Sequence, residues 1–94
     1  MTTQIRRSRR ANAEIEEIAA YLAEHNPLAA ERFLAALERA QWQLAEFPNS
    51  GAPGAVEGTR RLVVGNYIVS YRRAGEEVEI FAIRHARRRD ARPG

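Results

Sequence analysis

Residues 58–72 read Gly-Thr-Arg-Arg-Leu-Val-Val-Gly-Asn-Tyr-Ile-Val-Ser-Tyr-Arg. β-Branched and aromatic residues, which are enriched in strands, fill both halves of this stretch. Gly65-Asn66 stands between the halves, and a two-residue loop of this kind joins antiparallel strands tightly. The sequence therefore predicts strands over residues 59–64 and 67–72, joined as a β-hairpin.

A third strand is predicted immediately after this hairpin. Residues 73–77 contain Gly75 and form a second short turn. Residues 78–84 then alternate as a strand does, with one set formed by Val78, Ile80 and Ala82 and the other by Glu79, Phe81 and Ile83. Consecutive strands with short turns imply a three-stranded antiparallel meander.

Two helices are predicted upstream of a loop over residues 48–58, which is rich in Pro, Gly, Asn and Ser. Ser8 can cap the first helix, and Asn26-Pro27 both ends it and opens the second. Pro48 stops the second helix. The predicted apolar stripes are Ala11, Ile15, Ile18 and Leu22 in the first helix and Phe33, Leu37, Ala40, Leu44 and Phe47 in the second.

The fold class expected from this order is α+β. Residues 3–7 form a short strand, the two helices form an antiparallel hairpin, and the meander follows them. A helical hairpin packed on one face of a mostly antiparallel sheet would bury both apolar faces. Residues 1–94 are expected to form one domain, with a loose Arg-rich tail from about residue 85.

Composition narrows the setting in which this domain works. The chain has no cysteine, which suits a reducing compartment, and no apolar run of membrane-spanning length. Its first ten residues are polar and charged, unlike a secretory signal. We therefore expect a cytoplasmic protein that does not engage a membrane.

Charge is segregated along the chain. All 15 basic residues are arginine, and the formal net charge is +3. Residues 1–10 hold four arginines and no acid, residues 84–94 hold five arginines and one aspartate, and residues 11–47 hold seven glutamates and two arginines. The basic ends favour an acidic or phosphate-bearing macromolecule as partner.

Several kinds of site are not expected. His25 and His85 are the only histidines, they lie far apart, and neither has neighbours with metal-ligand spacing. The glycines match no nucleotide-binding pattern. We therefore expect no metal, no cofactor and no small-molecule substrate.

Three features remain as candidates for function. They are Arg60-Arg61 at the start of the first meander strand, Tyr67, Tyr71 and Arg72 on the middle strand, and Ile83 to Asp90 where the last strand enters the basic tail. Tyr67 and Tyr71 share a face by parity, for which core packing is the simplest role. The arginines are expected at the two ends of the sheet.

The segments described above resemble ParE-type toxins of the RelE/ParE superfamily, over about residues 5–90. The similar segments are residues 58–72, Val78-Glu79-Ile80, Ile83-Arg84-His85-Ala86-Arg87-Arg88, Phe47-Pro48 with Gly51, and Ser8, Ala11, Glu14, Ile15 and Ile18. The resemblance implies the toxin half of a bacterial type II toxin–antitoxin pair. It also implies a hetero-oligomer with a ParD-like antitoxin and DNA gyrase as the target.

The resemblance also implies site residues. The tail residues implied in target binding are His85, Arg87, Arg88 and Arg89. The residues we assign to antitoxin binding are Arg60, Arg61, Tyr71, Arg72 and Trp42. A gyrase inhibitor of this kind would need no catalytic residues of its own.

Three alternatives remain open. A ribosome-dependent mRNA endonuclease of the RelE kind would use His85 as acid or base, with Arg61, Arg72 and Arg84 holding charge. The absence of any tyrosine after Tyr71 counts against this interpretation. A simple nucleic-acid-binding module is the second alternative. A family member that binds its antitoxin without being toxic is the third.

Overall fold

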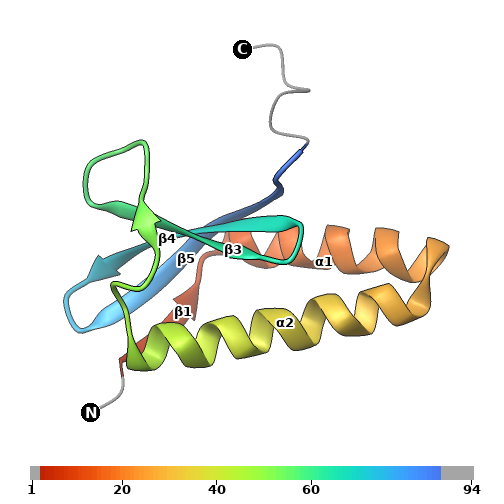
Figure 1. The fold of residues 1–94 in the computed structure, drawn as a ribbon, viewed down its shortest axis with the longest axis horizontal. Coiled ribbons are helices and arrows are strands. Elements are labelled where there is room, and N and C mark those ends of the chain that lie inside the picture. The colour runs from red at the N-terminus through yellow and green to blue at the C-terminus, as the bar shows by residue number, and fades with distance from the viewer. Residues whose placement is uncertain (1–2, 88–94) are drawn as a thin grey trace.

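The structure, a computed structural model, describes residues 3–87, and its elements follow the predicted order (Figure 1). In chain order they are β1 (Gln4–Arg7), α1 (Arg9–His25), α2 (Pro27–Glu46), β2 (Ala52–Pro53), β3 (Thr59–Val64), β4 (Tyr67–Ala74) and β5 (Glu77–His85). The predicted α+β class is confirmed. Of the predicted tail, His85 ends β5, whereas Arg88 and Arg89 lie outside the described residues.

The sheet has the strand order β1-β5-β4-β3-β2. Its centre is the predicted antiparallel meander β3–β4–β5. β1 pairs with β5 in parallel, because the helical hairpin carries the chain across before the meander begins. β2 lies in the segment predicted to be only a loop, and it forms the opposite edge by pairing with Arg60 and Arg61.

The turn between β3 and β4 is as tight as the sequence predicts. Val64 pairs with Tyr67, which leaves Gly65-Asn66 as a two-residue loop. Gly65 has φ of 61°, whereas Asn66 is not among the positive-φ residues. This pattern is that of a type II′ turn, in which glycine occupies the first position at no steric cost.

β5 departs from simple alternation. Ser70 pairs with Ala82, but the next residue of β4, Tyr71, pairs with Ile80, so Phe81 is an extra residue in β5. Such a bulge changes which side chains face the core. The predicted alternation, which put Ala82 on the same face as Ile80, is therefore wrong beyond Phe81. Ile83 is the residue buried together with Ile80.

Both helices begin at the predicted caps. The Ser8 side chain accepts a hydrogen bond from the Ala11 amide, and Asn26 does the same for Ala29 ahead of α2. α1 and α2 run antiparallel beside the sheet (Figure 1). α1 lies along β5, and α2 contacts β1 and β3.

The core fills the space between the helical hairpin and one face of the sheet. Its buried members are Ala11, Ile15, Phe33, Leu37, Ala40, Leu44, Val64, Val69, Tyr71, Val78, Ile80 and Ile83. The predicted stripe of α2 is thus confirmed except at its end. Phe47 follows the last helical residue as the C-cap, and its side chain is exposed.

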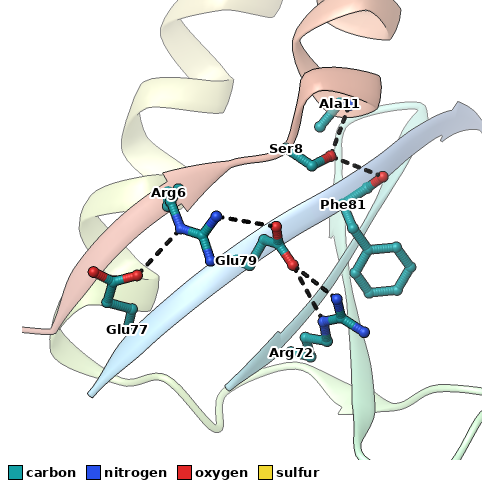
Figure 2. Close-up of polar contacts among 7 residues, drawn as sticks. All are labelled: Arg6, Ser8, Ala11, Arg72, Glu77, Glu79 and Phe81. Atoms are coloured by element: carbon teal, nitrogen blue, oxygen red, sulfur yellow. Dashed lines mark hydrogen bonds and ion pairs between the residues drawn. The ribbon is translucent and has the colours of Figure 1, made fainter. Parts of the chain in front are cut away.

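Ser8→Ala is expected to lower the free energy of unfolding by about 1 kcal/mol, the usual cost of losing an N-cap. Ser8 Oγ accepts from the Ala11 amide at 3.0 Å and donates to the Phe81 carbonyl at 3.4 Å (Figure 2). The melting temperature should fall by roughly 4–8 °C. Ser8→Thr keeps a hydroxyl that can accept from the Ala11 amide and donate to the Phe81 carbonyl, so it is the matched control. An equal loss in both variants would contradict the capping explanation.

Candidate functional site

Two hollows adjoin beneath the β3–β4 turn, between the helical hairpin and the sheet. The first has a volume of about 540 Å³ and lies between α1 and the end of β5. The second has a volume of about 550 Å³ and lies between α2 and the β3–β4 turn. Both are lined by Leu22, Asn66 and Tyr67, so they meet there. We call the two together the hairpin groove.

His85 closes the first hollow where β5 ends. Its ring contacts the edge of the Tyr67 ring, with centroids 5.2 Å apart, and Tyr67 in turn contacts Phe33 at 4.9 Å. His85 Nδ1 accepts a hydrogen bond from the Arg87 amide at 3.1 Å. In the neutral ring the proton must therefore be on Nε2, which makes this nitrogen the donor.

Arg84 and Glu14 also line the first hollow. The Nη1 atom of Arg84 is buried and has no hydrogen-bond partner among residues 3–87. Glu14 Oε1 accepts from the Ile83 amide at 2.7 Å, and its Oε2 pairs with Arg10 at 3.0 Å. The Glu14 carboxylate therefore satisfies a backbone amide of β5 in the part of the strand that β1 does not pair with, since that pairing ends at Ile80.

The other end of the sheet holds an ion-pair network (Figure 2). Glu79, which is almost fully buried, accepts from Arg72 at 3.1 and 3.2 Å and pairs with Arg6 at 3.4 Å. Arg6 also reaches Glu77 at 3.2 Å. Arg72 lies over the ring of Phe81, with its guanidinium carbon 5.6 Å from the ring centroid. These contacts hold β1, β5 and β4 together. The guanidinium of Arg72 is thereby already paired with a carboxylate of the same chain.

Two of the residues assigned to antitoxin binding, Arg60 and Tyr71, hold the loop after α2 against the sheet. Arg60 donates to the carbonyls of Gly51 at 2.6 Å and Asn49 at 3.2 Å, so it anchors the loop after α2. Tyr71 is completely buried, and its hydroxyl accepts from the Gly51 amide at 2.9 Å. Because its side chain is fully buried, Tyr71 presents no surface that an antitoxin could contact. Arg61 is exposed.

Exposed apolar side chains occur on both layers. Trp42 on α2 is 66% exposed, and Val63 on β3 is 69% exposed. Val63 and Arg61 alternate with Leu62, which packs on the core, so they face away from the helices. Trp42 and Arg61 therefore lie on different faces, and the residues assigned to antitoxin binding do not form one surface.

The residues proposed for a nuclease also do not converge. His85 pairs with Tyr67, whereas Arg72 lies five residues further along β4, about 17 Å at the rise of a strand. Arg61 faces away from the helices, and His85 contacts Tyr67 on the helical side. Only Arg84 shares a hollow with His85.

Sequence reasoning missed four charged residues of the hairpin groove, namely Glu14, Glu17, Arg32 and Arg39. A signal for two of them was present, because Ala29, Arg32, Ala36 and Arg39 recur at helical spacing beside the apolar stripe of α2. Among residues 3–87 no three His, Asp or Glu side chains gather as metal ligands. No described helix is both long and apolar enough to cross a membrane.

Comparison with known families supplies the identity. The family model described as "ParE toxin of type II toxin-antitoxin system, parDE" matches residues 5–90. The chain belongs to the ParE toxin family. This ParE-family chain is therefore a toxin of the type II toxin–antitoxin kind, as the resemblance in its sequence implies.

Individual relatives agree with this assignment. The chain is 41% identical over 85 residues to Y4kP of Sinorhizobium fredii, covering 88% of each protein. It is 37% identical over 79 residues to Toxin RelE2 of Caulobacter vibrioides, covering 84% of this chain and 90% of the relative. A solved chain from the chromosomal ParDE TA system of P. aeruginosa has the same fold, with a TM-score of 0.77 at 22% identity and coverage of 89% and 96%.

Proposed function

We propose that this ParE-family chain inhibits DNA gyrase and is held inactive by a ParD-like antitoxin bound in the hairpin groove. We favour gyrase over mRNA as the target because the residues that a nuclease would need lie far apart in the structure. RNA cleavage requires an acid, a base and a charge-stabilising group around one phosphate. Here Arg72 is bound to Glu79 at the far end of β4 from His85.

The target-binding part of this proposal rests on the end of β5. His85 lines the groove where β5 ends, and the Arg87 amide donates to its ring. In the sequence Arg88 and Arg89 follow, outside the described residues. Arg87 is exposed. A guanidinium can pair with a carboxylate or a phosphate, so this basic end suits the surface of a protein–DNA complex.

The antitoxin part of the proposal rests on the groove. An apolar groove flanked by charge is the usual receptor for an amphipathic arm of a partner. The solved relative of the same fold comes from a ParDE system. A partner that binds only the folded toxin would also stabilise it, which matters for a small domain of marginal stability.

A supercoiling assay with purified gyrase tests the target. The chain should inhibit supercoiling, and adding its cognate ParD-like antitoxin should relieve the inhibition. His85→Ala combined with Arg87→Ala should raise the inhibitory concentration at least about tenfold, as expected when about 1.4 kcal/mol of contact is lost. Arg73→Ala, at an exposed position of β4, is the matched control and should behave like the parent.

The same variants decide the runner-up. The relationship to Toxin RelE2 and the proximity of Arg84 to His85 keep an mRNA endonuclease as the second candidate. Cutting of mRNA on ribosomes, abolished by His85→Ala, with normal supercoiling would overturn the gyrase proposal. Inhibition of neither process by the folded chain would overturn the proposal that it is an active toxin.

A further inference from the structure

The hairpin groove has an apolar floor that runs from one hollow into the other. The floor is formed by Ile18, Leu22, Phe33, Ala36, Val64 and Tyr67. Asn66 of the β3–β4 turn and Tyr67 line both hollows, so the hollows meet beside this turn. A partner segment seated here would therefore pass from the α1 side to the α2 side.

The α2 side of the groove is basic. Arg32 and Arg39 line it, and no acidic residue does. Both side chains are exposed, and neither forms an ion pair within residues 3–87. Ala29 and Ala36 lie at the same helical spacing, and their small side chains leave the floor open between the two arginines.

The α1 side has the opposite balance. Two carboxylates, Glu14 and Glu17, line it against one guanidinium, that of Arg84. Glu14 is already engaged by the Ile83 amide and Arg10. Glu17 is exposed and has no hydrogen bond or ion pair in the described part of the chain, so its charge is available to a partner.

We propose that the groove binds one apolar segment of the antitoxin in a single orientation, with acidic side chains beside Arg32 and Arg39 and a basic side chain beside Glu17. The inference rests on the proposed function for its partner. Complementary charges at the ends select orientation and partner more than they add affinity, because like charges placed together are repelled. The reversed segment would place its acids against Glu17 and its base against two arginines.

Charge reversal at each end of the groove tests the inference in binding assays with the cognate ParD-like antitoxin. Arg32→Glu with Arg39→Glu should weaken binding at least about tenfold, and so should Glu17→Arg. The matched controls are Glu16→Arg, on the neighbouring position of α1 outside the groove, and Arg73→Glu on β4. Each control should change the affinity by less than about twofold, and melting curves establish that all variants are folded.

Synthetic peptides test orientation without the antitoxin. The probe has a leucine-rich centre, two glutamates at one end and two arginines at the other, and it should bind the parent chain more tightly than peptides with two acidic or two basic ends. Trp42 is the only tryptophan and lies three residues beyond Arg39, so it serves as an energy-transfer donor. An acceptor on the acidic end should quench Trp42 more than one on the basic end.

The triple variant Arg32→Glu, Arg39→Glu, Glu17→Arg should bind the same peptide with restored affinity and the opposite quenching pattern. Unchanged antitoxin affinity in both end variants would overturn the inference while leaving the antitoxin proposal intact. Failure of the antitoxin to bind the parent chain would instead refute the proposed function. A dimer of the parent chain that dissociates in the end variants would assign the groove to a second copy and overturn the inference.

Discussion

Gly51→Ala is expected to destabilise the fold by about 1–3 kcal/mol, as overpacking of a closed site does. A Cβ at this position would lie 2.6 Å from the Arg61 carbonyl oxygen and 2.8 Å from the Tyr71 hydroxyl. The first of these atoms belongs to the backbone of β3, and Tyr71 is fully buried in the core. The loop would have to move outward, which would break the bond from the Gly51 amide to Tyr71.

Thermal unfolding measures this effect, since each kcal/mol lowers the melting temperature of a domain of this size by roughly 4–8 °C. Gly58→Ala is the control, because Gly58 has φ of 86° and a Cβ there would meet no other atom within 4 Å. Its substitution therefore costs only the free energy of holding alanine in a left-handed conformation. Tyr71→Phe removes the hydroxyl alone. Combined with Gly51→Ala it should recover only part of the loss, because the clash with Arg61 remains. A loss no larger than that of Gly58→Ala would contradict the packing argument.

Local features of this fold could be predicted from the sequence because their causes are local. Ser8 and Asn26 cap helices because a short side chain reaches an amide three residues ahead. Gly65-Asn66 forms the predicted turn because a loop of two residues needs residue types that adopt a tight turn, and these two do. The spacing of Phe33 and Leu37 indicated the buried face of α2 because helical periodicity is fixed.

The features that the sequence did not predict have a different origin, since each depends on residues distant in sequence. Nothing near Phe81 marks it as the extra residue of a bulge, which arises from the pairing of β5 with β4. β2 is visible only once Ala52 is known to pair with Arg61. Parallel pairing of β1 with β5 is likewise a consequence of the whole chain path.

The candidate site shows the same division. Its arginines are evident in the sequence, but their availability depends on partners elsewhere in the fold. Arg60 is bound to two carbonyls of the loop after α2, and Arg72 is bound to Glu79, whereas Arg32 and Arg39 have no ion pair among the described residues. The sequence analysis selected Arg60 and Arg72 because each stands beside another candidate residue. The arginines that line the groove are instead Arg32 and Arg39, which stand singly along α2.

The edge of β5 beyond β1 presents the problem that every exposed strand edge presents, because unpaired backbone groups there can pair with another chain. β1 pairs with β5 only as far as Ile80. From that point α1 and its N-cap residue cover the edge: Ser8 donates to the Phe81 carbonyl, and Glu14 accepts from the Ile83 amide. The same carboxylate therefore stabilises the sheet and lines the hairpin groove.

Glu14→Ala is expected to lower the free energy of unfolding by about 1–3 kcal/mol, the cost of leaving a buried donor unsatisfied. Ile83 is almost fully buried, so little water can replace the lost acceptor at its amide. Hydrogen exchange at the Ile83 amide should accelerate more than at neighbouring amides of β5. Melting curves measure the global loss in the same samples.

Two variants separate the hydrogen bond from the charge of Glu14. Glu14→Gln keeps an oxygen that can accept from the Ile83 amide, so it should retain most of the stability. Arg10→Ala removes only the ion pair, in which the Arg10 side chain is 69% exposed, and such surface pairs contribute about 0–1 kcal/mol. If Arg10→Ala were as damaging as Glu14→Ala while Ile83 stayed protected, the ion pair and not the covered strand edge would be the source of the stability.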